Sequence, residues 1–391
     1  MSLVVRAESL LTPFSEIHQP QVTIDNRTIT AIASRGALDE PHHADHLDFP
    51  GAMLAPAYLD IHTHGAAGHD VMDADDASFD AIGAFLAARG VGAYLPTTVT
   101  APTDRILRSL EAIAGQIERA ESNPQACAGA HPLGIHLEGP FLSHSKRGVH
   151  PPDNLCELST DLLDRFWQAA RGRIALLTMA PELPGSLEFI QAATQRGIRI
   201  SLGHSNADTA DALAAIAAGA TSATHTFNAM RVLDHRDPGL LGVVLDDRKL
   251  YAELICDGIH VDPLLVRLFQ RAKGPDHGIL ITDSISATGM PDGTYRLGNM
   301  NVQVANGRCM YQGSLAGSVL TMDRAVRNFA QFTQSHWSSA VRYATSNPAR
   351  MMGLSHAYGE LAAGRPANLV VLSQEGNILA TMLDGRVIYR A

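Results

Sequence analysis

The sequence of 391 residues predicts an α/β protein, a (β/α)8 TIM barrel with a small β-sandwich domain built from both termini. Three observations support this prediction. Strand-like apolar segments alternate with helical stretches rich in alanine and leucine across the centre of the chain. Five of these segments end in a residue that can bind a metal or transfer a proton, and barrel active sites lie at the carboxyl ends of the strands. Both ends of the chain show strand and turn patterns instead.

The two ends predict the small domain. Residues 22–32 have the pattern of a β-hairpin, with a polar turn between two alternating segments. Residues 367–372 are strand-like, and an Asp384-Gly385 turn of the hairpin type separates two further apolar segments. Because these two β-rich ends enclose a long α/β centre, we expect them to assemble into one small domain comprising residues 1–52 and 361–391.

The centre of the chain, residues 53–360, predicts the barrel. Strands are expected at 57–62, 92–98, 133–138, 174–179, 198–203, 221–225, 250–256 and 278–283. Helices are expected at 78–89, 103–121, 161–171, 186–196, 208–218, 263–273, 321–334 and 338–352. Eight strands are the number that closes a barrel. The connection from 225 to 250 lacks a clear helical pattern, and 290–313 predicts a hairpin that turns at Asn306-Gly307.

Composition and charge limit the classes of function. The formal net charge of −10 argues against nucleic acid as a partner, because binding to phosphate backbones requires a basic surface. No apolar stretch reaches the roughly 20 residues of a membrane span, and the N-terminus lacks the pattern of a secretory signal. The cysteines are scattered and predict free thiols in a reducing cytoplasm: Cys127, Cys156, Cys256 and Cys309. We therefore expect a cytoplasmic protein.

Five residues at predicted strand ends could bind a metal. His62 and His64 are two residues apart, so both side chains point to one face of a strand. Glu138, His204 and His225 each follow another predicted strand. Taken singly, each has an ordinary explanation as a loop or core residue. Their shared position at the same end of different strands favours a metal site, and a carboxylate with imidazoles is typical of Zn²⁺ or Fe²⁺.

Asp283 ends the last predicted strand of the barrel. A carboxylate beside a metal-bound water can accept its proton and later deliver it to a leaving amine. The alternative is an aspartate that caps a helix. Together with the five candidate ligands, Asp283 indicates a metal-dependent hydrolase.

The same segments resemble the amidohydrolase superfamily, and within it the family of N-acetylglucosamine-6-phosphate deacetylases. The resemblance covers nearly the whole chain and rests on motifs in a fixed order. They are DIHTHG at 60–65, HLEGPF at 136–141, GHSNA at 203–207, HTFNAM at 225–230, DGIH at 257–260, TD at 282–283, ATGM at 287–290 and LAGS at 315–318. The resemblance implies hydrolysis of N-acetyl-D-glucosamine 6-phosphate to D-glucosamine 6-phosphate and acetate.

The resemblance also implies roles for individual residues. Glu138, His204 and His225 would hold the principal divalent ion, Zn or Fe, and His62 with His64 would allow a second. Asp283 would be the catalytic acid and base. Arg236 corresponds to an arginine that binds the 6-phosphate across a homodimer interface. The other substrate-binding positions that the resemblance implies are Val149, His150, Asn228, Ala229, Asp257, His260, Leu315, Ala316 and Gly317.

Three alternatives compete with this interpretation. The first is the same reaction on N-acetylgalactosamine 6-phosphate, because no residue in the sequence identifies the epimer. The second is a cyclic-amide hydrolase, which bridges two metals with a carbamylated lysine at a strand end. The only lysines, Lys146, Lys249 and Lys273, do not end predicted strands, which argues against it. The third is a non-catalytic binding protein, which would be expected to lack at least one of the six residues above.

Overall fold

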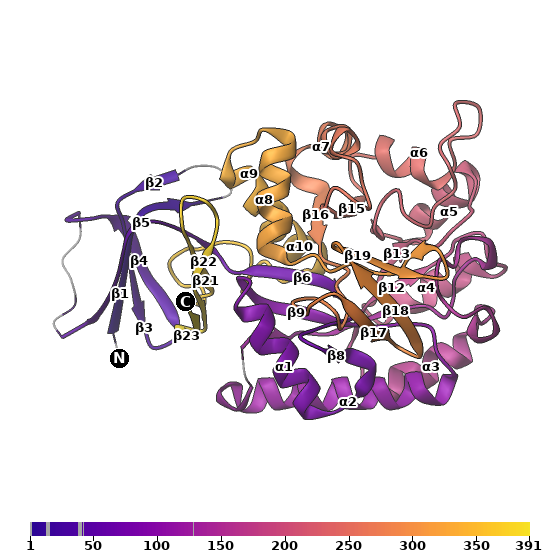
Figure 1. The fold of residues 1–391 in the computed structure, drawn as a ribbon, viewed down its shortest axis with the longest axis horizontal. Helices are drawn as coiled ribbons and strands as arrows, with labels where there is room; N and C mark the ends of the chain where they lie inside the picture. Colours follow the sequence, from indigo (N-terminus) through magenta and orange to yellow (C-terminus); the bar gives the residue numbers. More distant parts are fainter. Residues whose placement is uncertain (1, 13–15, 38–40, 42, 128) are drawn as a thin grey trace.

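The computed structural model describes residues 2–12, 16–37, 41, 43–127 and 129–391. They form a barrel surrounded by helices and, to one side, a smaller sheet (Figure 1). Both ends of the chain lie in this smaller sheet, so the polypeptide begins and finishes away from the barrel (Figure 1).

Parallel strands form the barrel in the order in which they occur in the chain. The strands are β6 (Tyr58–Thr63), β9 (Val91–Thr98), β11 (Ile135–Glu138), β12 (Ile174–Met179), β13 (Arg199–Leu202), β14 (Ser222–Ala223), β15 (Tyr251–Ile255) and β16 (Gly278–Ile281). A parallel bridge between Thr63 and Ser284 joins the last strand to the first. All eight predicted strands are present, although β14 is shorter than expected. Their carboxyl ends therefore meet at one face of the barrel.

Ten α-helices lie in the described part of the chain. They are α1 (Asp76–Ala87), α2 (Thr103–Ser122), α3 (Thr160–Ala169), α4 (Ser186–Gln195), α5 (Thr209–Ala218), α6 (Gly239–Asp246), α7 (Pro263–His277), α8 (Met322–Thr333), α9 (Trp337–Ala344) and α10 (Ser346–Met352). Helix α2 shows how the spacing of apolar residues predicts a helix. Ile106, Leu110, Ile113 and Ile117 recur at helical spacing and are buried. Each such burial contributes roughly 1.5–3 kcal/mol.

Two helix predictions need correction. The connection after β14 contains α6, which sequence reasoning missed because its eight residues are almost uniformly apolar and show no polar face. The helix predicted over 338–352 is two helices, which meet at Thr345 with a non-helical backbone (φ −133°, ψ −84°). Pro348 falls in the first turn of α10, where a proline is tolerated, whereas the interior of one long helix would exclude it.

One continuous sheet contains both termini. Its strands are β1 (Ser2–Leu11), β2 (Glu16–His18), β3 (Pro20–Asp25), β4 (Thr28–Ser34), β5 (Asp45–Pro56), β21 (Leu369–Leu372), β22 (Ile378–Leu383) and β23 (Arg386–Arg390). The order is β23-β22-β21-β5-β1-β3-β4, with β2 beside β1. Val5, Leu54 and Leu369 belong to an apolar core of its own. The N-terminal and C-terminal parts meet where β5 pairs with β21.

The predicted turns at both ends are confirmed. Strands β3 and β4 form the N-terminal hairpin, and β22 and β23 flank the C-terminal one. Asp384 and Gly385 both have positive φ (51° and 72°), as a two-residue hairpin turn requires.

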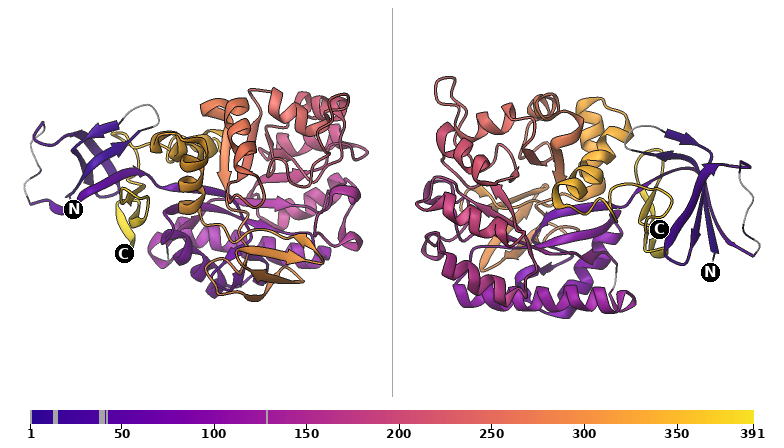
Figure 2. Two further views of the ribbon diagram at one scale, coloured as in Figure 1. Left: turned by 45° about the horizontal axis from the view of Figure 1, so that its top comes forward. Right: turned by 180° about the vertical axis from the view of Figure 1, so that it is seen from behind.

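The predicted excursion after β16 is a small antiparallel sheet beside the barrel mouth (Figure 2). It consists of β17 (Gly293–Leu297), β18 (Met300–Ala305), β19 (Arg308–Tyr311) and β20 (Ser314–Leu315). Asn306 and Gly307 form its turn with positive φ, as predicted. Burial alternates along β18, so Met300, Val302 and Val304 face inward.

The remaining elements are short. They are β7 (Gly65–Ala66), β8 (His69–Asp70), β10 (His131–Pro132) and the 3-10 helices η1 (Val71–Asp73), η2 (Pro124–Ala126), η3 (His144–Lys146) and η4 (Pro152–Asn154). Among the described residues no helix is long and apolar enough to cross a membrane. The four cysteines are free in the structure, as predicted.

Candidate metal centre and substrate cavity

A cavity of about 250 Å³ opens at the carboxyl ends of the barrel strands. Side chains that follow five different strands converge on it, since each strand places its next residues at this face. The lining residues are His64, Val99, Glu138, Gly148, Val149, His150, His204, His225, Asn228, Ala229, Ile255, His260, Asp283, Leu297, Met300, Leu315 and Gly317.

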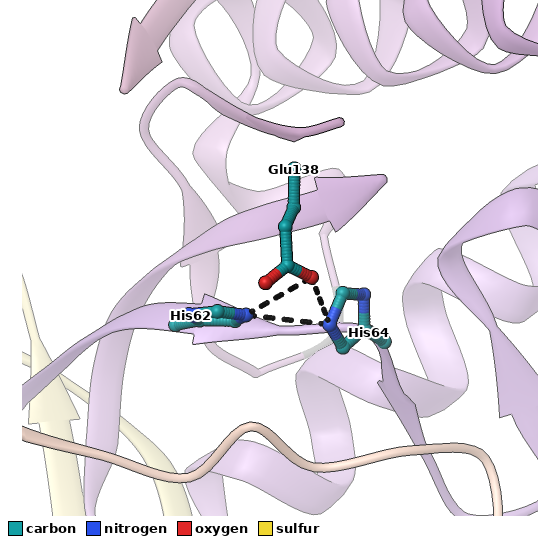
Figure 3. A group of neighbouring side chains, drawn as sticks. All are labelled: His62, His64 and Glu138. Atoms are coloured by element: carbon teal, nitrogen blue, oxygen red, sulfur yellow. Dashed lines mark hydrogen bonds and ion pairs between the residues drawn. The ribbon is translucent and has the colours of Figure 1, made fainter. Parts of the chain in front are cut away.

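His62 in β6 and His64 directly after this strand face Glu138 at the end of β11 (Figure 3). The Nε2 atoms of His62 and His64 are 3.3 Å apart and lie 3.5 and 3.1 Å from Glu138 Oε2. Both rings are held from behind. His62 Nδ1 is 3.1 Å from Glu253 Oε2, and His64 Nδ1 is 3.1 Å from the Thr97 carbonyl oxygen.

His204 and His225 approach the other oxygen of the same carboxylate. Their Nε2 atoms are 3.1 Å apart and lie 3.3 and 3.2 Å from Glu138 Oε1. Both residues have positive φ (47° and 28°), a costly backbone conformation that turns their side chains into the cavity. His204 Nδ1 lies 3.0 Å from the Lys146 carbonyl oxygen. His225 Nδ1 is buried and finds no hydrogen-bond partner in the described structure.

This arrangement fits a cation. The carbonyl oxygens beside His64 and His204 can only accept, so the Nδ1 atoms of these rings carry hydrogen and donate. In the neutral rings the Nε2 atoms then present lone pairs, and so do the oxygens of Glu138. Lone pairs that converge at 3.1–3.3 Å repel one another unless a positive charge lies among them. Two clusters share Glu138 and could each hold an ion: His62, His64 and Glu138, and Glu138, His204 and His225.

The pKa of His64 also indicates that a positive charge is stabilised at this position. Burial alone would lower the pKa of His64, but its contacts with Asp283 and Glu138 raise this pKa to about 9. A divalent ion would supply the charge instead and would displace the proton. The donor set of imidazole nitrogens and carboxylate oxygens is the chemistry that Zn²⁺ and Fe²⁺ accept.

Asp283 lies on the cavity side of this cluster. Its backbone N–H donates to the His62 carbonyl oxygen (2.9 Å), and its Oδ1 is 3.2 Å from His64 Nε2. Burial would raise the pKa of Asp283, but the charge of His62 and the hydrogen bond from His64 lower it to about 2. The carboxylate is therefore ionised at neutral pH and can accept a proton.

His150 comes from the loop after β11 and is neutral. Its Nδ1 accepts a hydrogen bond from the Thr100 backbone N–H (3.3 Å) and lies 2.8 Å from the Thr100 hydroxyl. A peptide N–H can only donate, so the ring hydrogen is on Nε2, which lies 3.8 Å from Glu138 Oε2. Burial, reinforced by the charge of His204, lowers the pKa of His150 to about 3. A neutral donor thus points into the cavity.

The rest of the cavity combines polar and apolar groups. Six positions that the resemblance assigns to the substrate line it: Val149, Asn228, Ala229, His260, Leu315 and Gly317. Asp257 and Ala316 do not line it. Asp257 instead fixes the His260 ring, because its Oδ2 lies 2.6 Å from His260 Nδ1. Ala316 is buried between two lining residues.

Arg236 is not brought to the cavity within one chain. It lies exposed in the loop between β14 and α6, where its backbone N–H donates to Asp234 Oδ1 (2.8 Å). Val232 and Leu233 in the same loop are also exposed (77% and 49%).

Sequence reasoning missed the residues that hold the histidines in place. Glu253 in β15 is fully buried and accepts from both His62 Nδ1 and the His225 backbone N–H (3.2 Å). A carboxylate inside the apolar segment YAELI was the available signal. Thr97 and Thr100 also pack behind the site and belong to no quoted motif, and His136, the first residue of the HLEGPF motif, lies beside Thr97. Such contacts orient metal ligands and set their tautomers.

No lysine side chain contributes to either candidate metal cluster. Lys273 Nζ donates to the carbonyl oxygens of Val244 and Asp247 (2.9 and 2.5 Å), and Lys249 is exposed. Lys146 contributes only its backbone carbonyl, to His204. The two candidate metal clusters share a carboxylate, that of Glu138, and no lysine side chain.

Comparison with known proteins identifies the class. Residues 53–388 match the amidohydrolase family, and the chain belongs to that family. Two curated relatives have names that specify a particular enzyme within this family. The chain is 37% identical over 372 residues to an N-acetylglucosamine-6-phosphate deacetylase of Vibrio furnissii, covering 95% of this chain and 91% of the relative. It is 36% identical over 388 residues to an N-acetylgalactosamine-6-phosphate deacetylase of Escherichia coli O157:H7, covering 99% of each.

A solved structure agrees with these relatives. The structure is that of a mutant N-acetyl-D-glucosamine-6-phosphate deacetylase of Mycobacterium smegmatis in complex with N-acetyl-D-glucosamine-6-phosphate. It is 32% identical to this chain, matches with a TM-score of 0.91 and covers 99% of both chains.

Proposed function

We propose that this protein hydrolyses the acetamide bond of N-acetyl-D-glucosamine 6-phosphate, releasing D-glucosamine 6-phosphate and acetate. The observation that carries the proposal is the cluster of four imidazoles around Glu138, with the ionised Asp283 beside it in one cavity. The full-length relatives with this activity support the choice of substrate.

We assign Glu138, His204 and His225 to the principal ion and His62 with His64 to a second. When bound, a divalent ion, Zn or Fe, lowers the pKa of water and polarises the acetyl carbonyl. Asp283 removes the proton from the attacking water. It then delivers this proton to the leaving amine nitrogen, so that acetate and the free amine separate.

His150 donates its Nε2–H to the acetyl oxygen as negative charge develops there. The low pKa of His150 keeps the ring neutral, and the Thr100 N–H keeps its hydrogen on Nε2. We expect His150→Ala to lower kcat about 10²–10³-fold, the usual effect of removing one oxyanion donor. Steady-state kinetics with metal content measured in parallel would check this. A kcat within threefold of the wild type would contradict the role.

The 6-phosphate contacts Arg236 from a second copy of the chain. The exposed loop residues Val232 and Leu233, together with Leu213 on α5 (53% exposed), offer an apolar surface for such a homodimer. An arginine beside this surface can reach across it and bind phosphate through two parallel N–H groups. We therefore assign Arg236 to the partner's cavity.

Arg236→Ala is expected to raise KM about 10–100-fold for the phosphorylated substrate, because a charge-assisted contact is lost. The kcat/KM for unphosphorylated N-acetylglucosamine should change little. The control is Arg248→Ala, which removes another exposed arginine. Mixing Asp283→Asn with Arg236→Ala protomers should restore activity, since a hybrid dimer has one complete site. Equal loss on both sugars, or no restoration, would contradict the assignment.

The experiment that tests the function measures acetate release by the metal-loaded protein from three sugars in parallel. They are N-acetylglucosamine 6-phosphate, its galacto epimer and unphosphorylated N-acetylglucosamine. Fast release from N-acetylglucosamine 6-phosphate alone is the expected result. The galacto epimer is the second candidate, favoured by the 36% identical relative that acts on it. Release from neither phosphorylated sugar, with metal bound, would reject the proposal.

We also propose a cellular location and a division into domains. The free cysteines support a cytoplasmic location. The separate apolar cores support a division into residues 53–360 and a terminal domain of 1–52 with 361–391.

A further inference from the structure

A second, larger cavity lies outside the barrel mouth, between α2, η1 and the hairpin of β17 and β18. Its volume is about 730 Å³, and three arginines line it: Arg105, Arg108 and Arg296. None of the three belongs to the candidate catalytic site. Two carboxylates line this second cavity as well, so the lining has a formal positive charge in a chain whose formal net charge is −10.

These arginines are not neutralised by carboxylates. Arg105 and Arg296 each direct Nη2 to the Gly298 carbonyl oxygen, at 3.4 Å, so the two guanidinium groups converge on one neutral acceptor. Among the described residues no carboxylate lies within ion-pair distance of them or of Arg108. Asp73 and Glu111 also line the cavity, but the Asp73 carboxylate accepts a hydrogen bond from the Asp70 backbone N–H (2.9 Å). Arg108 and Arg296 are exposed and Arg105 is half-buried, so the positive groups are open to solvent and accessible to an anion that would reduce their mutual repulsion.

The geometry of α2 adds to the positive potential. Arg105 lies in the first turn of this helix, where the helix dipole is positive and acidic residues are favoured. Arg108 is three residues further and therefore on the same face. Ser109, beside it, is 1% exposed, lines the same cavity, and its hydroxyl has no hydrogen-bond partner in the described structure. A buried donor without an acceptor is costly and indicates a missing acceptor.

We propose that this cavity is a second phosphate-binding site, distinct from the catalytic cavity. Guanidinium groups bind phosphate oxygens through charge-assisted, often bidentate, hydrogen bonds, and a hydroxyl completes such a site. The volume admits a phosphate ester as well as the free ion. The Ser109 hydroxyl and the three arginines would then contact the oxygens of one anion.

The site is connected to the catalytic cavity through the turn at Gly298. The Gly298 N–H donates to Asp70 Oδ2 (2.8 Å), and its carbonyl oxygen accepts from Arg105 and Arg296. The flanking residues Leu297 and Met300 line the catalytic cavity. An anion that holds the arginines therefore also fixes the part of the hairpin that covers the substrate.

The test is calorimetric titration of the metal-loaded protein with inorganic phosphate and, separately, with glucose 6-phosphate. Arg108→Ala should weaken one class of binding site about tenfold and leave the kcat of acetate release unchanged. Arg165→Ala is the matched control, because Arg165 is exposed on α3 and lies outside the cavity. Arg236→Ala should affect only the other class, the phosphate site of the proposed substrate. Tighter binding of the ester or of the free ion would identify the source of the phosphate.

Two results would overturn the proposal. One is phosphate binding by Arg108→Ala that equals that of the wild type, and the other is equal weakening by Arg165→Ala. Hydrogen exchange gives a second readout that does not depend on activity. Phosphate should slow exchange of the Gly298 amide in the wild type more than in Arg108→Ala, and an equal effect in both would reject the connection to the hairpin.

Discussion

Asp283→Asn is expected to keep its metal and lose about 10²–10⁴-fold in kcat, the range that general acid–base catalysis contributes. Asparagine preserves the size of the side chain but can neither accept a proton from water nor deliver one to the amine. In the wild type the pKa of about 2 keeps the group ionised before the reaction. Steady-state kinetics and metal content of the purified variant measure the two effects separately.

A matched control is available nearby. Asp262 is exposed and caps α7, where asparagine caps about as well as aspartate, so Asp262→Asn should be indistinguishable from the wild type. Turnover by Asp283→Asn within fivefold of the wild type would remove Asp283 from the proposed mechanism. Loss of the metal in this variant would instead make it a ligand.

Glu138→Gln is expected to abolish stable metal binding and to reduce activity more than 10³-fold. One carboxylate contacts all four imidazoles, with Oε2 facing His62 and His64, and Oε1 facing His204 and His225. The neutral amide removes the negative charge that both clusters share. Metal analysis after dialysis, together with thermal unfolding with and without added Zn²⁺, would show the loss. The wild type should gain stability from the metal because the ion binds only the folded chain.

The control for this variant is Glu188→Gln on α4, which makes the same chemical change at an exposed position. Full metal content in Glu138→Gln would show that the histidines suffice without the carboxylate. The proposed principal site would then have to be redrawn around the imidazoles.

The order of chemical groups along the chain made much of the site predictable. A polar residue after an apolar strand segment must lie at the end of that strand, and parallel strands in a barrel bring all such ends to one face. His62, His64, Glu138, His204 and Asp283 could therefore be expected together before any coordinate was known. The spacing of His62 and His64 also fixed that both rings point the same way.

Short elements and distant contacts were beyond sequence reasoning. Helix α6 has too few residues to show a period, and the break between α9 and α10 depends on one proline. Glu253 lies 191 residues from His62, and only the closed barrel brings the two together. Asp257, which the resemblance assigned to the substrate, lies 2.6 Å from His260 Nδ1 through its Oδ2, a contact that no local pattern shows.

By itself, the sequence determined which chemistry the barrel mouth carries, because local pattern fixes where each strand ends and which side chain comes next. The tertiary structure decided which nitrogen faces the cavity in His62, His64 and His204, since Glu253, Thr97 and Lys146 hold the opposite nitrogen from behind. It also decided that Arg105, Arg108 and Arg296 share one cavity. These outcomes depend on distances between segments far apart in the chain, which no local pattern encodes.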